Sequence, residues 1–107
     1  MEKTYTDEIM KLFETVVGLR SVEECAAFFE DICTIKELQD ISQRLQVAQM
    51  LSEGKNYQEI SKVTGASTAT ICRVNKCLVY GSGGYRSVLA SAAERAKADE
   101  AAGVEDK

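Results

Sequence analysis

Small and basic side chains share one face of a helix that the sequence predicts near residues 67–79: Ala69, Cys72, Arg73 and Lys76. Arginine and lysine pair with phosphate groups, and an arginine can also reach the edge of a guanine. Residues 55–86 carry five basic residues against one acidic residue, whereas residues 1–54 carry five against eleven, within a net charge of −4. This concentration of positive charge predicts a surface that binds nucleic-acid phosphates.

The elements that must position this surface are predicted to be a helix-turn-helix over residues 57–79. Gly65 indicates the break between two short helices, because glycine adopts a positive φ without steric cost. Ser67 is predicted to cap the second helix by accepting a hydrogen bond from the N–H of Thr70. Apolar residues at i, i+3 and i+7 predict the inward face of that helix: Ile71, Val74 and Leu78. A helix-turn-helix places its second helix in the DNA major groove, whereas a plain helical hairpin with the same packing would bind no nucleic acid.

Other kinds of chemistry find little support in the sequence. Four cysteines stand at irregular spacings, with no CxxC pair and no histidine, so neither a zinc site nor a Cys/His nucleophile is expected. The thiols are expected to be reduced and to pack as small apolar groups. The glycines at 81–84 lack the preceding strand and the GK[ST] ending of a phosphate-binding loop. We therefore expect no enzyme, no metal and no cofactor.

The 107 residues are enough for one domain, and no apolar run approaches the ~18 residues of a membrane span. The polar, acidic N-terminus is not a signal peptide, which predicts a cytoplasmic protein. Residues 1–90 are expected to form a helical domain for dimerisation and DNA binding, and residues 91–107 an exposed helical extension with a disordered tail from Gly103.

Three helices are predicted before the helix-turn-helix. The first runs from a cap at Thr4 or Thr6 to about residue 17, the second spans 21–33 and the third spans 35–52. Capping boxes are predicted at the second and third starts: Ser21 with Glu24, and Thr34 with Glu37. The second and third helices carry apolar residues on more than one side, which a short chain has little material to cover. A partner subunit would cover them.

These features resemble the tryptophan-repressor superfamily, and within it the YerC/YecD-type group of Trp-repressor-like proteins. The resemblance rests on the long helix through QRLQVAQMLSEG, the segment TGASTATICRVNKCL and the order of the helices, and it covers roughly residues 5–90. It implies an all-α, Trp-repressor-like multi-helix domain with a helix-turn-helix that forms an intertwined homodimer on double-stranded DNA. The base-reading positions that it implies are Thr68, Ala69 and Cys72.

The resemblance also implies a possible effector pocket, because the tryptophan repressor binds L-tryptophan between its core and its reading unit. The pocket positions fall here on Thr34, Arg44, Thr70 and Arg73. Val74 stands where the family pattern has a glycine and could fill the space of the indole ring, while Cys77 replaces a serine and offers only a weak acceptor. We therefore do not expect tryptophan to be the effector, and the sequence names no other small molecule. Arg44 is interpreted instead as a surface arginine paired with Asp40 or a neighbouring acid.

The sequence thus predicts a homodimeric, sequence-specific transcription regulator, most simply a repressor that occupies a palindromic operator. Thr68, Ala69 and Cys72 are too short for a bidentate contact to a purine, so direct reading depends on Arg73, with help from water and DNA shape. Phosphate contacts are expected from Lys55, Gln58, Lys62 and Lys76. Two alternatives stay open: a helical protein-interaction module without sequence-specific DNA binding, and a tryptophan-dependent repressor. Salt dependence separates the first alternative from DNA binding, because phosphate contacts weaken steeply as salt rises.

Overall fold

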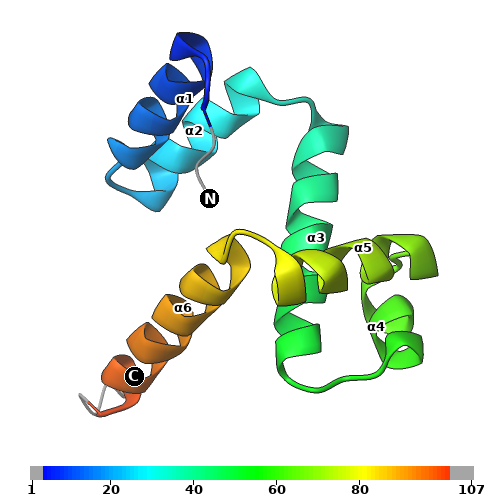
Figure 1. Cartoon of the computed structure of the whole chain (residues 1–107). Helices are drawn as coiled ribbons and strands as arrows, with labels where there is room; N and C mark the ends of the chain where they lie inside the picture. Colours follow the sequence, from blue (N-terminus) through cyan, green and yellow to red (C-terminus); the bar gives the residue numbers. More distant parts are fainter. Residues whose placement is uncertain (1–3, 102–107) are drawn as a thin grey trace. The chain divides into compact units, whose positions relative to one another are not determined.

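The computed structural model describes residues 4–101, and within them the chain is all-α (Figure 1). Its helices are α1 (Asp7–Val17), α2 (Val22–Ile32), α3 (Ile35–Ser52), α4 (Tyr57–Thr64), α5 (Thr68–Tyr80) and α6 (Gly84–Ala101). The chain divides between residues 39 and 40 into two compact units. The first unit holds α1, α2 and the start of α3, and the second holds the rest of α3 with α4, α5 and α6. The tail predicted to be disordered from Gly103 lies outside the described residues.

Local side-chain chemistry sets the helix starts where the sequence predicts them. The predicted cap residues are found at three helices: Thr6 for α1, Ser21 for α2 and Ser67 for α5. Asn56 caps α4. At the start of α3, Thr34 Oγ1 accepts from the Glu37 N–H at 3.0 Å, and the Glu37 carboxylate accepts from the Thr34 N–H at 2.8 Å. At α2 the Glu24 carboxylate accepts from the N–H of Arg20. Each N-cap side chain that accepts a backbone N–H at a helix start stabilises its helix by about 1 kcal/mol.

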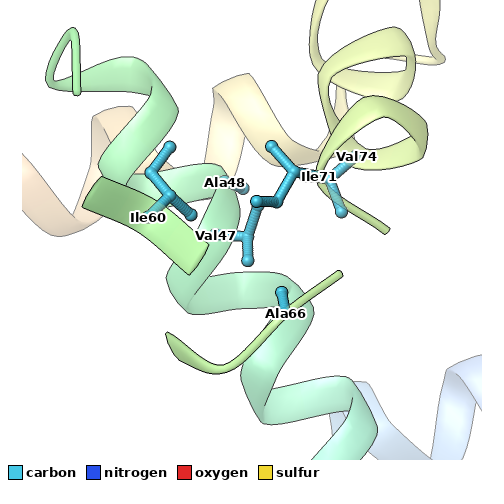
Figure 2. Packing of buried hydrophobic residues seen from close by; sticks show 6 residues of the cluster. All are labelled: Val47, Ala48, Ile60, Ala66, Ile71 and Val74. Atoms are coloured by element: carbon cyan, nitrogen blue, oxygen red, sulfur yellow. The ribbon is translucent and has the colours of Figure 1, made fainter. Parts of the chain in front are cut away.

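The buried core lies in the second unit (Figure 2). It consists of six apolar side chains from α3, α4, the following turn and α5: Val47, Ala48, Ile60, Ala66, Ile71 and Val74. Partly buried side chains pack around them: Met50, Leu51, Tyr57, Tyr85 and Leu89. Because full burial of a large aliphatic side chain contributes about 1.5–3 kcal/mol, this cluster holds the helix-turn-helix against α3.

The first unit leaves its apolar surface uncovered in the single chain. Among the described residues, neither α1 nor α2 has a buried side chain. An apolar stripe runs along one side of α1 and consists of Ile9, Leu12 and Phe13. These side chains are each about two-fifths exposed, at 40%, 39% and 42%. The helices α1 and α2 have 11 residues each, a length at which an isolated helix is marginal in water. Much of the apolar surface of these helices is therefore open to further apolar contacts.

Candidate nucleic-acid interface

The helices α4 and α5 form a helix-turn-helix that bends at Gly65 (Figure 1). Gly65 has a φ of +77°, in the left-handed region that favours glycine, and its N–H donates to the Ser61 carbonyl at 2.8 Å. Ser67 Oγ then accepts from the Thr70 N–H at 3.1 Å, which starts α5. The turn residue and the cap are the ones that the sequence predicts.

Side-chain hydrogen bonds fix the turn between the two helices. Ser61 Oγ donates to the Ala66 carbonyl at 2.9 Å, and the Ala66 N–H donates to Thr64 Oγ1 at 3.1 Å. From α3, the Gln43 amide donates to the Thr64 carbonyl at 3.1 Å. The end of α4 is therefore bonded both to the turn and to the supporting helix. The sequence interpretation missed Gln43 and Thr64, because no local pattern links a glutamine to a carbonyl so far along the chain.

The helix α5 separates an apolar inward face from a polar outward face. Ile71 and Val74 are buried and Leu78 is half-buried, as the i, i+3, i+7 spacing predicts. The opposite face is exposed, and we call it the reading face: Thr68, Ala69, Cys72, Arg73 and Lys76. The structure thus brings the four predicted base-reading residues together on one exposed surface, with Lys76 beside them.

The predicted phosphate-binding residues are exposed but do not gather at one point. Gln58, Lys62 and the base-reading candidate Thr68 line an open groove between α4 and the start of α5, together with Tyr57 and Ser61. Each of these side chains carries a hydrogen-bond donor, although the Ser61 hydroxyl already donates to the Ala66 carbonyl. Lys55 lies outside this lining, and its Nζ is 4.0 Å from a carboxylate oxygen of Glu59. An exposed pair of this kind contributes little, so it leaves the lysine able to exchange its partner.

Tyr57 is a polar residue of this interface that the sequence interpretation missed. Its ring packs against the core cluster and is half-buried. Partial desolvation raises the pKa of Tyr57, and the neighbouring Cys72 raises this pKa further through its charge and a hydrogen bond. A hydrogen bond with Asn75 acts in the opposite direction and lowers the pKa. Tyr57 is the first residue of α4, so its ring connects the start of that helix with the core cluster.

The side chains at the possible effector-pocket positions either make other hydrogen bonds or are exposed to solvent. Thr34 belongs to the capping box of α3, and the Thr70 hydroxyl accepts a hydrogen bond from Ser67 Oγ at 3.1 Å. Arg44 and Arg73 are exposed. Val74 is 1% exposed and belongs to the core cluster, so its side chain fills the volume that a glycine at this position would leave open.

The described residues also bear on whether the chain has membrane-spanning helices, metal-ligating groups or disulfides. No helix in residues 4–101 is both long enough and apolar enough to cross a membrane. Over the same range, no group of three or more histidine, cysteine or acidic side chains could hold a metal ion. All four cysteines are free thiols; Cys25 and Cys33 are half-buried, whereas Cys72 and Cys77 are exposed, so the expected packing as apolar groups describes the first two better.

Fold and interface together define an all-α helix-turn-helix protein, and comparison with known proteins identifies its family. The model of the Trp repressor protein family matches residues 7–93, and the chain belongs to that family. Members of this family are DNA-binding proteins and not enzymes, which agrees with the expectation from the sequence.

Individual relatives are similar over most of their length. The chain is 48% identical to the uncharacterised protein YerC of Bacillus subtilis over 89 residues, which are 83% of this chain and 86% of YerC. A candidate Trp repressor from Staphylococcus aureus has a crystal structure with a TM-score of 0.79 and 42% identity, covering 81% of this chain and 87% of that one. A TrpR-like protein from Eubacterium eligens has a TM-score of 0.76 and 42% identity, covering 95% of each chain. The Trp-repressor-like fold predicted from the sequence is therefore confirmed for the single chain.

Proposed function

We propose that this protein is a cytoplasmic, homodimeric transcription regulator that binds a palindromic DNA operator through α4 and α5 and represses by occupying it. The observation that carries the proposal is the two-sided character of α5. Its inward face is fixed in the core by Ile71 and Val74, and its reading face presents small and basic side chains to solvent. A rigidly seated helix with this surface suits the DNA major groove.

The uncovered apolar surface of the first unit supports the homodimer. Because α1 and α2 bury no side chain in the described part of the single chain, a second copy that covers Ile9, Leu12 and Phe13 would remove a large apolar area from water. Two helix-turn-helix units related by a two-fold axis then require two half-sites about one DNA turn apart. This symmetry is why the operator is proposed to be palindromic.

The buried Val74 supports a regulator that needs no tryptophan. The valine side chain belongs to the core cluster, next to the exposed Arg73 and on the same helix as Thr70. An indole ring could enter here only by displacing a packed side chain, which costs core burial. The protein is therefore proposed to bind its operator without a tryptophan co-repressor.

Selection of bound duplexes from random DNA, at moderate salt and with or without L-tryptophan, tests this function. Enrichment of a palindrome in both conditions is expected. Enrichment only with tryptophan would show that Val74 does not close the pocket. Absence of enrichment in both conditions, together with binding to another macromolecule that is insensitive to salt, would favour a protein-interaction module.

Replacing Arg73 by alanine is expected to weaken binding to the selected operator by about 1–3 kcal/mol, because Arg73 is the one long basic side chain among the predicted base-reading residues. Fluorescence anisotropy titrations at fixed salt measure the effect. The matched control is Arg95→Ala on α6, which removes the same charge from an exposed position outside the helix-turn-helix. A dissociation constant that stays unchanged in Arg73→Ala would contradict the role of Arg73.

A further inference from the structure

A polar side chain of α3 reaches the turn of the helix-turn-helix. Gln43 Nε2 donates to the Thr64 carbonyl at 3.1 Å, and this bond is partly buried. The same nitrogen lies beside the turn glycine, because a Cβ added at Gly65 would stand 4.0 Å from it. Gln43 and Val47 are four residues apart and share one side of α3, so the bond lies one helical turn beyond the core contact of Val47.

The carbonyl that Gln43 binds needs a partner from outside its own helix. Thr64 is the last residue of α4, and a carbonyl at this position has no partner within the helix. The Thr64 hydroxyl donates to the Ile60 carbonyl at 2.7 Å and accepts from the Ala66 N–H at 3.1 Å. Gln43 therefore holds a residue that is itself bonded to both sides of the turn. Removal of the amide would leave a partly buried carbonyl without this partner.

The opposite side of α3 is apolar and open. Ile41 and Leu45 stand two residues before and after Gln43, which is about 200° around the helix in either direction. Their side chains are 45% and 44% exposed in the single chain. The helix α3 thus carries the helix-turn-helix on one side and, on the other, an apolar surface that the second copy of the proposed homodimer can cover.

We propose that Gln43 is a positioning residue that sets the spacing between the two half-sites of the operator. By bonding the end of α4 to α3, its amide fixes how each helix-turn-helix is oriented on the helix that supports it. This inference rests on the proposed function, because it assumes a homodimer on palindromic DNA. It gives a side chain outside the helix-turn-helix a part in the choice of operator.

The apolar core alone leaves the helix-turn-helix free to pivot on α3. Val47 and Ala48 are the side chains of α3 in the buried cluster; both are small, and they are adjacent along the chain. Apolar burial has no strong direction, so a small rotation about this contact retains most of it. A hydrogen bond requires a donor–acceptor distance near 3 Å and a favourable angle. A bond one turn away from the core contact therefore supplies a second fixed point and restricts the rotation.

Operator spacing is sensitive to such a rotation. A change of one base pair between half-sites moves one of them by about 3.4 Å along the DNA and by about 35° around it. A pair of firmly held helix-turn-helix units should reject this change, whereas units that pivot should tolerate it. The measured quantity is therefore the affinity for the selected palindrome divided by the affinity for duplexes with one central base pair inserted or removed.

Two substitutions test the proposal. Gln43→Met keeps the length of the side chain and removes the donor, and Gln43→Glu keeps its shape and offers only acceptors at neutral pH. The matched control is Gln46→Met, which changes an exposed glutamine of the same helix. The affinity ratio should fall about three- to tenfold in both Gln43 variants, as expected for a lost hydrogen bond, and should stay unchanged in the control. Without DNA, hydrogen exchange at the Gly65 amide should become faster in the Gln43 variants alone.

Each other result overturns a stated part of the inference. A ratio that stays unchanged in either Gln43 variant would show that the bond does not set the spacing. An equal loss of affinity for all three duplexes would make Gln43 a direct DNA contact instead. Unchanged exchange at Gly65 would show that Gln43 does not hold the turn. If the unmodified protein selected no palindrome, the proposed function and the spacing role would both fail, while the exchange rates would still decide whether Gln43 holds the turn.

Discussion

Replacing Ile71 by alanine is expected to lower the free energy of unfolding by about 2–5 kcal/mol. Ile71 is fully buried and belongs to the cluster that joins α3, α4 and α5. Truncation removes most of its apolar contacts and leaves a cavity between helices whose backbones are held by the bonded turn at Gly65. Since a whole domain is commonly stable by only 5–15 kcal/mol, this single change should use up a large part of the stability.

Urea denaturation followed by circular dichroism, at one fixed protein concentration, measures this loss. The matched control is Val79→Ala, which also shortens an apolar side chain on α5 but at a position that is 50% exposed. The control should change stability by less than about 1 kcal/mol. Equal effects in the two variants would mean that Ile71 is not a central core residue.

Replacing Phe13 by glutamate is expected to convert the proposed homodimer into monomers. Phe13 lies on the uncovered α1 stripe beside Ile9 and contacts the Tyr5 ring edge-to-face at 5.2 Å between ring centroids. Loss of its burial costs about 2 kcal/mol in each subunit. Because a dimer carries the change twice, the dissociation constant should rise about a thousandfold, and the buried carboxylate adds a further penalty.

Sedimentation equilibrium over a range of protein concentrations measures the dissociation constant. The matched control is Val63→Glu, which places the same charge on an apolar residue of α4 that is 58% exposed and lies outside the first unit. The control should remain a dimer. A Phe13→Glu protein that stays dimeric at the concentrations where the unmodified protein does would place the subunit interface elsewhere.

The helix starts could be predicted from the sequence because short-range chemistry decides them. Ser67 was predicted to bond the Thr70 N–H, and it does so at 3.1 Å. Gly65 was predicted to end α4, and its positive φ does so. The split of α5 into two faces follows from the spacing of Ile71 and Val74, which depends only on helix geometry.

The contacts that set the interface could not be predicted in the same way. The bond from Gln43 to the Thr64 carbonyl joins residues 21 positions apart, and Tyr57 packs against a core cluster to which α3 and α5 contribute. Such pairs depend on how helices cross and which rotamers fit, and a glutamine or tyrosine at these positions is equally ordinary as a solvated residue. The sequence also predicted that α3 needs apolar partners on two sides. In the single chain Val47 and Ala48 are buried, whereas Ile41 and Leu45 stay 45% and 44% exposed.

The small extent of the core along the chain has a consequence for the time that the protein needs to become functional. The buried side chains lie between Val47 and Val74, fewer than about thirty residues apart, so closing this core costs little loop entropy. Helical units with such local contacts fold within microseconds to milliseconds. Pairing of two subunits is instead bimolecular, so its rate decreases as the protein concentration decreases. For the proposed homodimeric regulator at low concentration, the delay between synthesis and operator binding would therefore be set by how often two chains meet rather than by how fast each one folds.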